Sequence, residues 1–280
     1  MYKTPSGCVS WRNLPAPVSF DRLTIMRFAR SSAATTACPI ELAWGGKLPS
    51  MGDFLWSNER TTLRTQLDGW LARGMHQFRL PQGDNWQPGF DQALMWNFIV
   101  PEGIWNQGCV AGCVSPSCDR VGRRFPFIVA YGLAAPLPAW FFSKTVNLIP
   151  SLLSRTGVLL FNGIRRRWPK ETLIPLIEQE LLGWQALLPV LKQGTDAPSS
   201  DSVIMDVLLG DTTGNNATAT VPNNRFSSFP WNDVIDHLGA ESASSFWWTN
   251  GADNAQLKAF SYDAHPDNAI MTWLFGRSAT

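Results

Sequence analysis

A glycine-rich stretch that carries a lysine, Trp44 to Phe54, is the first place in this sequence where residue types and spacing suggest chemistry. Glycines directly before a lysine can bind phosphate in a P-loop, where a Ser or Thr hydroxyl follows the lysine and holds magnesium. Leu48 occupies that hydroxyl position, and no glycine lies five residues before Gly46. The spacing therefore excludes a P-loop. We expect a defined loop instead, because glycine permits close backbone approach and proline fixes φ.

A second dense stretch, Ser115 to Pro126, carries one aspartate and three arginines: Asp119, Arg120, Arg123 and Arg124. Arginine pairs bidentately with a carboxylate and also recognises phosphate. Two hypotheses follow, and both remain open from the sequence. The charged residues brace the loops internally, or they form a site for a small anionic ligand or substrate that uses Lys47, Ser115, Ser117, Asp119 and the arginines. In either case we expect the two stretches to meet, with Lys47 or Asp53 near Asp119 to Arg124.

Other catalytic and metal-binding patterns are weak. The spacing of Cys109, Cys113 and Cys118 is not the paired Cys-x₂-Cys of a structural zinc site, so we interpret these residues as small core side chains. The three histidines lie far apart in the sequence. A serine of the second stretch could join His265 and an aspartate in a triad, but no G-x-S-x-G elbow is present. We therefore assign no catalytic residue, metal or cofactor, and we expect a protein that is not an enzyme.

Regular elements are expected around the first stretch. The apolar run Ile40 to Trp44 predicts a strand that enters it. Ser57 is a candidate N-cap for the helix that leaves it. Pro81 to Gly89 is expected to be a polar loop, and Trp96 to Val100 has the composition of a strand. One apolar face of the predicted helix consists of Leu63, Leu67, Trp70, Leu71, Met75 and Phe78.

Two predicted strands enclose the second stretch: Cys109 to Val114, expected at the centre of the sheet, and Phe125 to Leu133. This order of elements suggests a partly antiparallel sheet with helices on its faces. Further along, the patterns predict helices over Trp140–Leu153, Leu173–Leu191 and His265–Phe275, loops over Gln193–Ser202 and Gly210–Asn224, and a hairpin formed by Phe246–Thr249 and Gln256–Tyr262.

Composition limits the function further. The net charge of +1 argues against nucleic acid as the main partner, which would favour a basic excess. Five cysteines, an odd number in 280 residues, do not describe a secreted disulfide framework, so we expect a cytoplasmic protein. The uncharged run Phe125 to Phe142 contains three prolines and a glycine, so membrane insertion is not expected. Fourteen tryptophans predict extensive aromatic packing, with an aromatic contact surface as the alternative.

The chain is expected to form one domain over residues 40–276, with a looser subregion after about residue 195. Residues 1–39 lack periodicity and are rich in Ser, Thr, Ala and Pro, which is typical of a poorly ordered leader. Met26 is an alternative to Met1 as the translation start.

Taken together, the motifs resemble the TagF family of type VI secretion-associated proteins, also called ImpM. Gly46 to Phe54 is similar to the family's G-K-L-P-x-x-G-D-F opening, and Ser117 to Pro126 is similar to its S-x-D-x-x-G-R-x-F-P block. Asp68, Trp70 and Leu71 fit the D-x-W-L pattern of the intervening helix, and Phe246 to Gly251 resembles a later W-W-T-x-G element. The signature residues are Gly46, Lys47, Leu48, Pro49, Gly52, Asp53, Phe54, Ser117, Asp119, Arg120, Gly122, Arg123, Phe125 and Pro126.

The resemblance implies a three-layer α-β-α sandwich around a mixed, partly antiparallel sheet. It also implies a cytoplasmic accessory protein that restrains type VI secretion post-translationally and acts by protein–protein contacts. The implied partners are type VI secretion components, among them a forkhead-associated (Fha) scaffold protein. The alternative is an enzyme or small anionic-ligand binder that uses the Lys47, Ser117, Asp119 and Arg123 loops.

Overall fold

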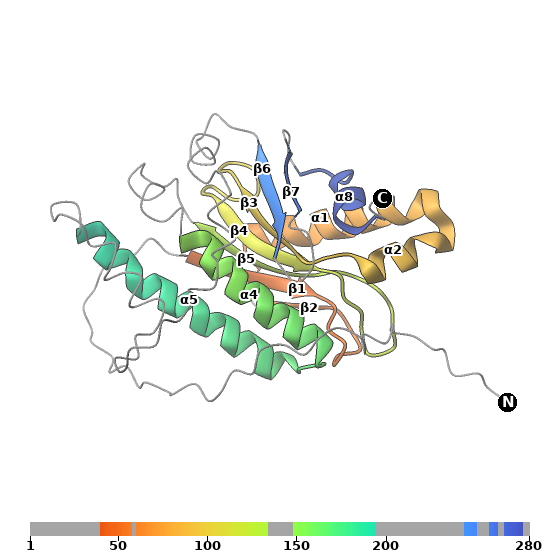
Figure 1. Cartoon of the computed structure of the whole chain (residues 1–280), viewed down its shortest axis with the longest axis horizontal. Coiled ribbons are helices and arrows are strands. Elements are labelled where there is room, and N and C mark those ends of the chain that lie inside the picture. Colours follow the sequence, from red (N-terminus) through yellow and green to blue (C-terminus); the bar gives the residue numbers. More distant parts are fainter. Residues whose placement is uncertain are drawn as a thin grey trace, which may run out of the picture.

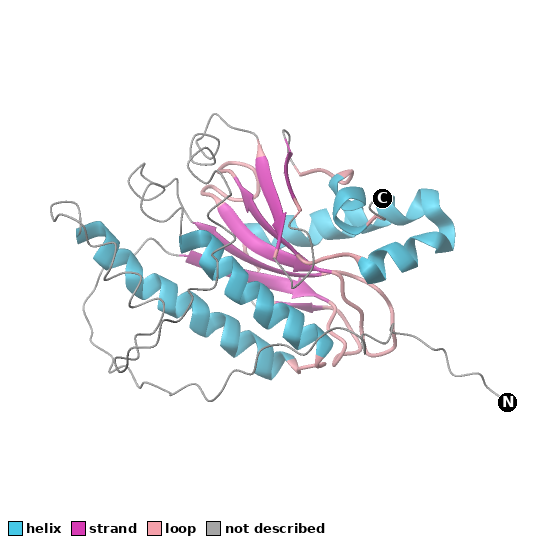
Figure 2. Ribbon diagram, viewed as in Figure 1, coloured by secondary structure: helices cyan, strands magenta, loops and turns pink. Residues whose placement is uncertain are grey.

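The structure is a computed structural model, and it describes residues 40–57, 60–133, 148–193, 244–250, 258–262 and 266–276. Within these ranges, helices flank a seven-stranded sheet (Figure 1, Figure 2). The expected leader over residues 1–39 and the loop expected over 210–224 lie outside the described residues. So do most of the looser subregion after residue 195 and all of the loop expected over 193–202 except Gln193, which ends a helix. None of the described helices is both long enough and apolar enough to span a bilayer.

The strands of the sheet follow the order β2-β1-β5-β4-β3-β6-β7. Their bounds are β1 Ile40–Gly46, β2 Leu55–Trp56, β3 Trp96–Val100, β4 Val110–Ser115, β5 Phe127–Leu133, β6 Ser245–Thr249 and β7 Ala259–Tyr262. The predicted strands are present within a few residues of their expected bounds, and β4 lies at the centre of the sheet as expected.

Each strand pair in the described ranges is antiparallel. The parallel component expected for a mixed sheet is therefore not found among these strands. The physical reason is that β3, β4 and β5 follow one another with short connections, whereas a parallel pair needs a long crossover. The predicted hairpin of β6 and β7 is confirmed, since Trp248 pairs with Ala259.

Strand β5 explains why the sheet carries helices on both faces. Its side chains alternate, so that Phe127, Val129 and Tyr131 belong to one hydrophobic cluster and Ile128 and Ala130 belong to the other. A strand that is buried on both sides reads as a continuous apolar run rather than as alternating polar and apolar residues. For this reason the first half of the uncharged run Phe125 to Phe142 has the apolar composition of a membrane span, although it forms a central strand.

On one face lie α1 (Thr62–Arg79), the 3₁₀ helix η1 (Leu80–Asn85), α2 (Trp86–Gln92) and α8 (Ile270–Phe275). The predicted apolar face of α1 is buried as expected. Its N-cap is Thr61 rather than Ser57, because the Thr61 hydroxyl accepts from the backbone N–H of Arg64. The segment expected to be a polar loop is instead η1 and α2, since Trp86 and Phe90 bury their rings in this cluster.

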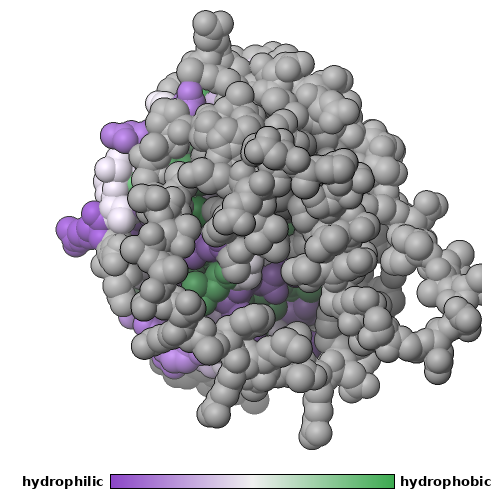
Figure 3. All heavy atoms as spheres, turned by 90° about the vertical axis from the view of Figure 1, so that its left-hand side faces the viewer, coloured by the Kyte–Doolittle hydropathy of each residue, from purple (hydrophilic) through white to green (hydrophobic). Residues whose placement is uncertain are grey.

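On the other face lie α4 (Leu148–Arg165) and α5 (Lys170–Gln193), which pack side by side below the sheet in Figure 1. The helix predicted over Trp140–Leu153 corresponds to α4, whose described part begins at Leu148. The helix does not end at Leu153 but continues through the apolar segment Gly157 to Phe161. Figure 3 shows the end of the molecule from which β1 begins, where many of the described side chains in view are hydrophilic. The two signature stretches lie at the opposite end of the sheet.

The tryptophans mainly build the core, as the sequence predicted. Trp70, Trp105 and Trp247 are buried and lie within ring contact of one another, and Phe98 contacts the rings of Trp105 and Trp247. Such pairs add to the hydrophobic gain from burying large rings. Trp273, on α8, is an exception because it is exposed.

Candidate functional site: the two signature loops

Sheet pairing brings the two signature stretches together. Strand β5 pairs with both β1 and β4, and Phe127 is opposite both Gly46 and Ser115. The loop that follows β1 and the loop that joins β4 to β5 therefore leave the same end of adjacent strands. Their meeting follows from the antiparallel register alone, and it confirms the prediction that Lys47 lies near the Asp119 to Arg124 segment.

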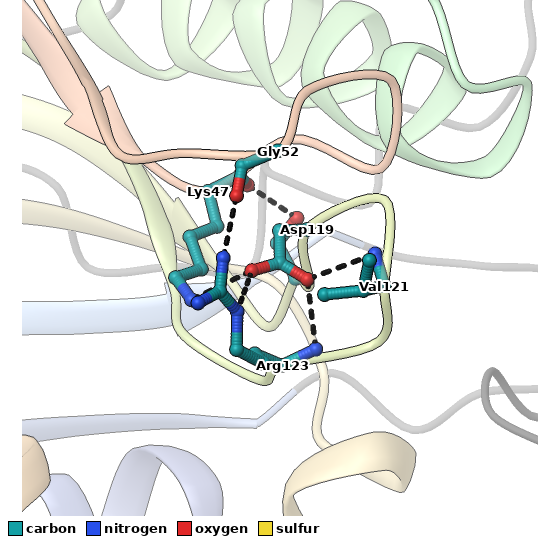
Figure 4. A network of polar contacts seen from close by, with 6 residues as sticks. Lys47, Gly52, Asp119, Val121 and Arg123 are labelled. Carbon is teal, nitrogen blue, oxygen red and sulfur yellow. Dashed lines mark hydrogen bonds and ion pairs between the residues drawn. The ribbon is translucent and has the colours of Figure 1, made fainter. Parts of the chain in front are cut away.

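The centre of the site is an ion-pair network around Asp119 (Figure 4). Lys47 Nζ donates to Asp119 Oδ2 at 2.8 Å, and Arg123 Nε donates to the same oxygen at 2.6 Å. The side chain of Lys47 is 7% exposed and that of Asp119 is fully buried, whereas that of Arg123 is 61% exposed. The carboxylate thus neutralises a lysine that would otherwise be a buried, unpaired charge.

The other oxygen of Asp119 shapes its own loop. Oδ1 accepts from the backbone N–H of Val121 at 3.0 Å and of Arg123 at 2.9 Å. Burial alone would raise the pKa of Asp119, but the hydrogen bonds from Lys47 and Arg123 outweigh it and lower the pKa to about 2. Asp119 is therefore a permanent anion at neutral pH and not a general acid or base.

Three further hydrogen bonds join the loops to each other. Ser117 Oγ donates to the Lys47 carbonyl at 2.7 Å, and the backbone N–H of Arg120 donates to the Met51 carbonyl at 2.7 Å. Arg123 Nη2 donates to the Gly52 carbonyl at 2.6 Å (Figure 4). Each signature loop therefore satisfies polar groups of the other. This geometry fits the hypothesis that the charged residues brace the two loops internally.

Gly46 allows this close approach. Its φ is +123°, and a Cβ at this position would overlap the carbonyl oxygen of Pro126. Gly122, with φ of +88°, supplies the reversal at the tip of the second loop. The glycines and the proline of the two signatures thus fix the geometry of the backbone, and the charged residues hold the loops together.

The remaining signature residues divide into buried and exposed. Leu48, Pro49, Phe125 and Pro126 are buried behind the network. Phe54 is exposed, packs edge-on against Phe125 and lies under the Lys47 ammonium, 4.7 Å from ring centroid to Nζ. Asp53 and Arg120 are also exposed. Asp53, the other expected partner of the second stretch, forms no ion pair within the described ranges.

Sequence reasoning missed the partner of Arg124. Its guanidinium binds the carboxylate of Asp91 bidentately at 2.7 and 2.7 Å and also donates to Gln87 at 3.0 Å. Asp91 lies in α2, part of which was expected to be a loop, and no local pattern links it to a residue 33 positions away.

The alternative catalytic and metal-binding patterns are not assembled where the chain is described. Ser115 Oγ donates to the Pro116 carbonyl rather than to a histidine, and His265 lies outside the described residues. Cys109 and Cys113 belong to the same cluster under α4, which confirms their interpretation as core residues. No group of three or more His, Cys, Asp or Glu side chains in the described ranges could hold a metal ion.

Comparison with known protein families gives a match for part of the chain. Residues 43–173 match the model of the TagF N-terminal domain family, which is type VI secretion system-associated. This segment of the chain is similar to that domain. The matched range runs from β1 into the start of α5 and contains both signature loops, so the resemblance seen in the motifs is confirmed there.

A solved structure shares the fold of this chain. The crystal structure of PA0076 from Pseudomonas aeruginosa PAO1 matches it with a TM-score of 0.56 and 22% sequence identity, over 86% of this chain and 96% of that one. None of the curated proteins matches the chain. The family assignment therefore supports a type VI secretion-associated role, and the structural likeness supports the fold.

Proposed function

We propose that this protein is a non-enzymatic negative regulator of a bacterial type VI secretion system. It acts post-translationally, in the cytoplasm and without a cofactor, by binding components of the secretion apparatus, among them a forkhead-associated (Fha) scaffold protein. The TagF N-terminal domain supports the secretion-associated role. The regulatory direction and the Fha partner come from the family resemblance described for the motifs.

The observation that carries the proposal is the closed network of Lys47, Asp119 and Arg123. A catalytic site needs a nucleophile or proton carrier that is accessible to a substrate. Here the lysine is buried and paired, and the aspartate is held as an anion by its neighbours. The most specific residues of the sequence therefore build a rigid platform, which suits a protein whose task is to present a surface.

The surface that this platform presents combines apolar and cationic groups. Phe54 and Val121 are exposed, Val121 by 66%, and the guanidinium of Arg123 lies between the two loops that carry them. We call Phe54, Arg120, Val121 and Arg123 the loop surface. Aromatic and arginine side chains dominate the binding energy of many protein interfaces, particularly when they are held rigidly before binding.

The alternative, a small anionic ligand held by Lys47, Ser117, Asp119 and Arg123, gains no support from this geometry. Lys47 and Ser117 point to partners inside the network, and Asp119 would repel an anion placed between them. A ligand at this place would have to displace the Asp119 carboxylate from a buried lysine, which is costly because the desolvated charges are already paired.

The test replaces Val121 with serine in the full chain and compares it with Leu182→Ser, whose side chain is 64% exposed on α5, outside both signature loops. We expect Val121→Ser, and more strongly the double variant with Phe54→Ser, to recover less Fha protein on co-purification and to leave secretion unrestrained. Leu182→Ser should behave as the wild type. Undiminished co-purification and normal restraint in the folded double variant would contradict the loop surface, and unchanged secretion in a deletion strain would contradict the regulator.

A further inference from the structure

Two arginines of the loop surface flank Gly52. Nη2 of Arg123 donates to the Gly52 carbonyl at 2.6 Å (Figure 4), and Nη2 of Arg120 lies 3.6 Å from the position that a Cβ on Gly52 would take. Covalent geometry therefore keeps the ends of the two guanidinium groups within about 10 Å of each other. This separation is close to the Debye length at physiological ionic strength, so the two positive charges act together on a charged partner.

The carboxylates of the two loops do not cancel the positive charge of this pair. Lys47 and Asp119 neutralise each other inside the network, which leaves the charge of Arg123 in excess. In the part of the chain that the structure describes, the guanidinium of Arg120 forms no ion pair and no hydrogen bond. Asp53, which is exposed in the first loop, offsets at most one of the two charges. The loop surface therefore keeps an unmatched positive charge.

The backbone that carries Arg120 and Val121 is held in place without a partner. The N–H of Gly122 donates to the Asp119 carbonyl at 3.0 Å, which makes Arg120 and Val121 the central residues of a hydrogen-bonded turn. The N–H of Arg120 donates to the Met51 carbonyl at 2.7 Å. Binding at this turn therefore requires little ordering of the backbone, and the main cost in entropy is the lost rotamer freedom of the Arg120 side chain.

Exposed apolar side chains accompany the two charges. Val121 follows Arg120 in the turn and is 66% exposed, and Phe54 of the first loop is 53% exposed. The Phe54 ring is already positioned, because it packs edge-on against Phe125. A partner that fits this surface has to present an apolar side chain together with negative charge.

We propose that the loop surface binds an acidic segment of a protein partner. A carboxylate of that segment lies between Arg120 and Arg123, and an apolar side chain of the segment contacts Phe54 and Val121. Arginine binds carboxylates through paired N–H donors, and complementary charge sets the specificity and the association rate of an interface. The inference rests on the proposed function, because it names the chemistry of the partner at the surface that this function uses.

The decisive variant is Arg120→Glu, and Arg73→Glu is its matched control. Both arginines are exposed and both changes lower the net charge of the protein by the same amount, but Arg73 lies on α1, outside the two loops. The Arg120 side chain makes no hydrogen bond or ion pair with the described residues, so both variants should keep the wild-type urea midpoint of unfolding. Arg123 is left unchanged because its side chain binds Asp119.

The first measurement is the affinity of the full chain for purified Fha protein, by isothermal titration calorimetry at low and at high salt. At low salt we expect Arg120→Glu to bind about tenfold or more weakly than the wild type, and the loss should shrink at high salt because salt screens the charges. Arg73→Glu should bind within about twofold of the wild type, and Arg120→Lys, which keeps the charge, should recover most of the affinity. Equal losses in Arg120→Glu and Arg73→Glu would indicate only diffuse attraction and would overturn the inference.

The second measurement separates this inference from the identity of the partner. Two synthetic peptides, one with glutamates around a single leucine and one with glutamine in place of each glutamate, are titrated with the full chain by fluorescence anisotropy. The wild type should bind the glutamate peptide at least about tenfold more tightly, and Arg120→Glu should lose most of this preference. The preference without Fha binding would contradict the proposed partner and support the acidic segment. Fha binding that Arg120→Glu does not weaken would leave the proposed function standing and overturn the inference, as would a wild type without the preference.

Discussion

At the residue scale, Asp119 organises the signature loops. One of its oxygens binds two cationic side chains, and the other closes the turn that carries Val121 and Arg123. A single carboxylate therefore connects the position of Lys47 to the conformation of the second loop. Leaving one member of such a buried pair without the other is strongly destabilising, by about 3–5 kcal/mol, because a desolvated charge remains uncompensated.

The first prediction from this network concerns pH. The pKa of Asp119 is about 2 in the folded protein, and an aspartate in an unfolded chain has a pKa of about 3.9. Because the folded pKa is the lower one, the stabilisation is complete above about pH 5 and is lost as the pH falls from about 4 towards 2. We expect a loss of about 2 kcal/mol in the free energy of unfolding between pH 6 and pH 2.5. Urea unfolding at pH 6, 4 and 2.5 measures it.

The control for that prediction removes the pair. Lys47→Met with Asp119→Leu leaves no buried charge, so the double variant should lose less stability at pH 6 than Asp119→Leu alone, and should show a flatter stability profile between pH 4 and 2.5 than the wild type. An unchanged pH dependence after removal of Asp119 would show that another carboxylate is responsible.

At the scale of elements, the strand ends decide where the loops lie. Strands β1 and β4 both end opposite the start of β5, and Gly46 is the point of closest approach. The loops therefore depend on one backbone position as well as on their charged side chains.

Replacing Gly46 tests this dependence. We expect Gly46→Ala to destabilise the protein by more than 2 kcal/mol, because the positive φ and the overlap with the Pro126 carbonyl act together. Gly183→Ala is the matched control, since a Cβ at this position in α5 would meet nothing within 4 Å. It should leave stability unchanged or raise it by up to about 1 kcal/mol. Urea unfolding measures both, and a Gly46→Ala protein as stable as the wild type would contradict the close approach.

At the scale of the whole molecule, the sheet separates two hydrophobic clusters, and both are sealed by helices. Cys109 and Cys113 lie in the cluster beneath α4, and Cys118 is buried in the second signature loop. Burial, with a smaller contribution from Glu102, raises the pKa of Cys109 to about 12, and burial also raises the pKa of Cys113. Few thiolates are therefore present at these positions near neutral pH.

Maleimide labelling of the full chain at pH 7.5 tests the sealing of this core. Peptide mass spectrometry should find Cys109, Cys113 and Cys118 unlabelled in the native protein and labelled after unfolding in urea. Rapid native labelling of Cys109 or Cys113 would show that the helices on that face open readily, since a buried thiol reacts only when the structure around it opens.

The sequence alone determined the strands other than β2 and the apolar face of α1, because these features follow from local periodicity and from glycine and proline chemistry, which act within a few residues. It also predicted that the two signature stretches meet, but the antiparallel register of β1, β5 and β4 is what brings them together. The sequence left open whether the charged residues brace the loops or form a ligand site. The tertiary structure favours the brace by burying Lys47 against Asp119, 72 positions apart. Only packing could also place Asp91 against Arg124 and the end of α4 beside both loops, because these contacts join residues with no shared local pattern.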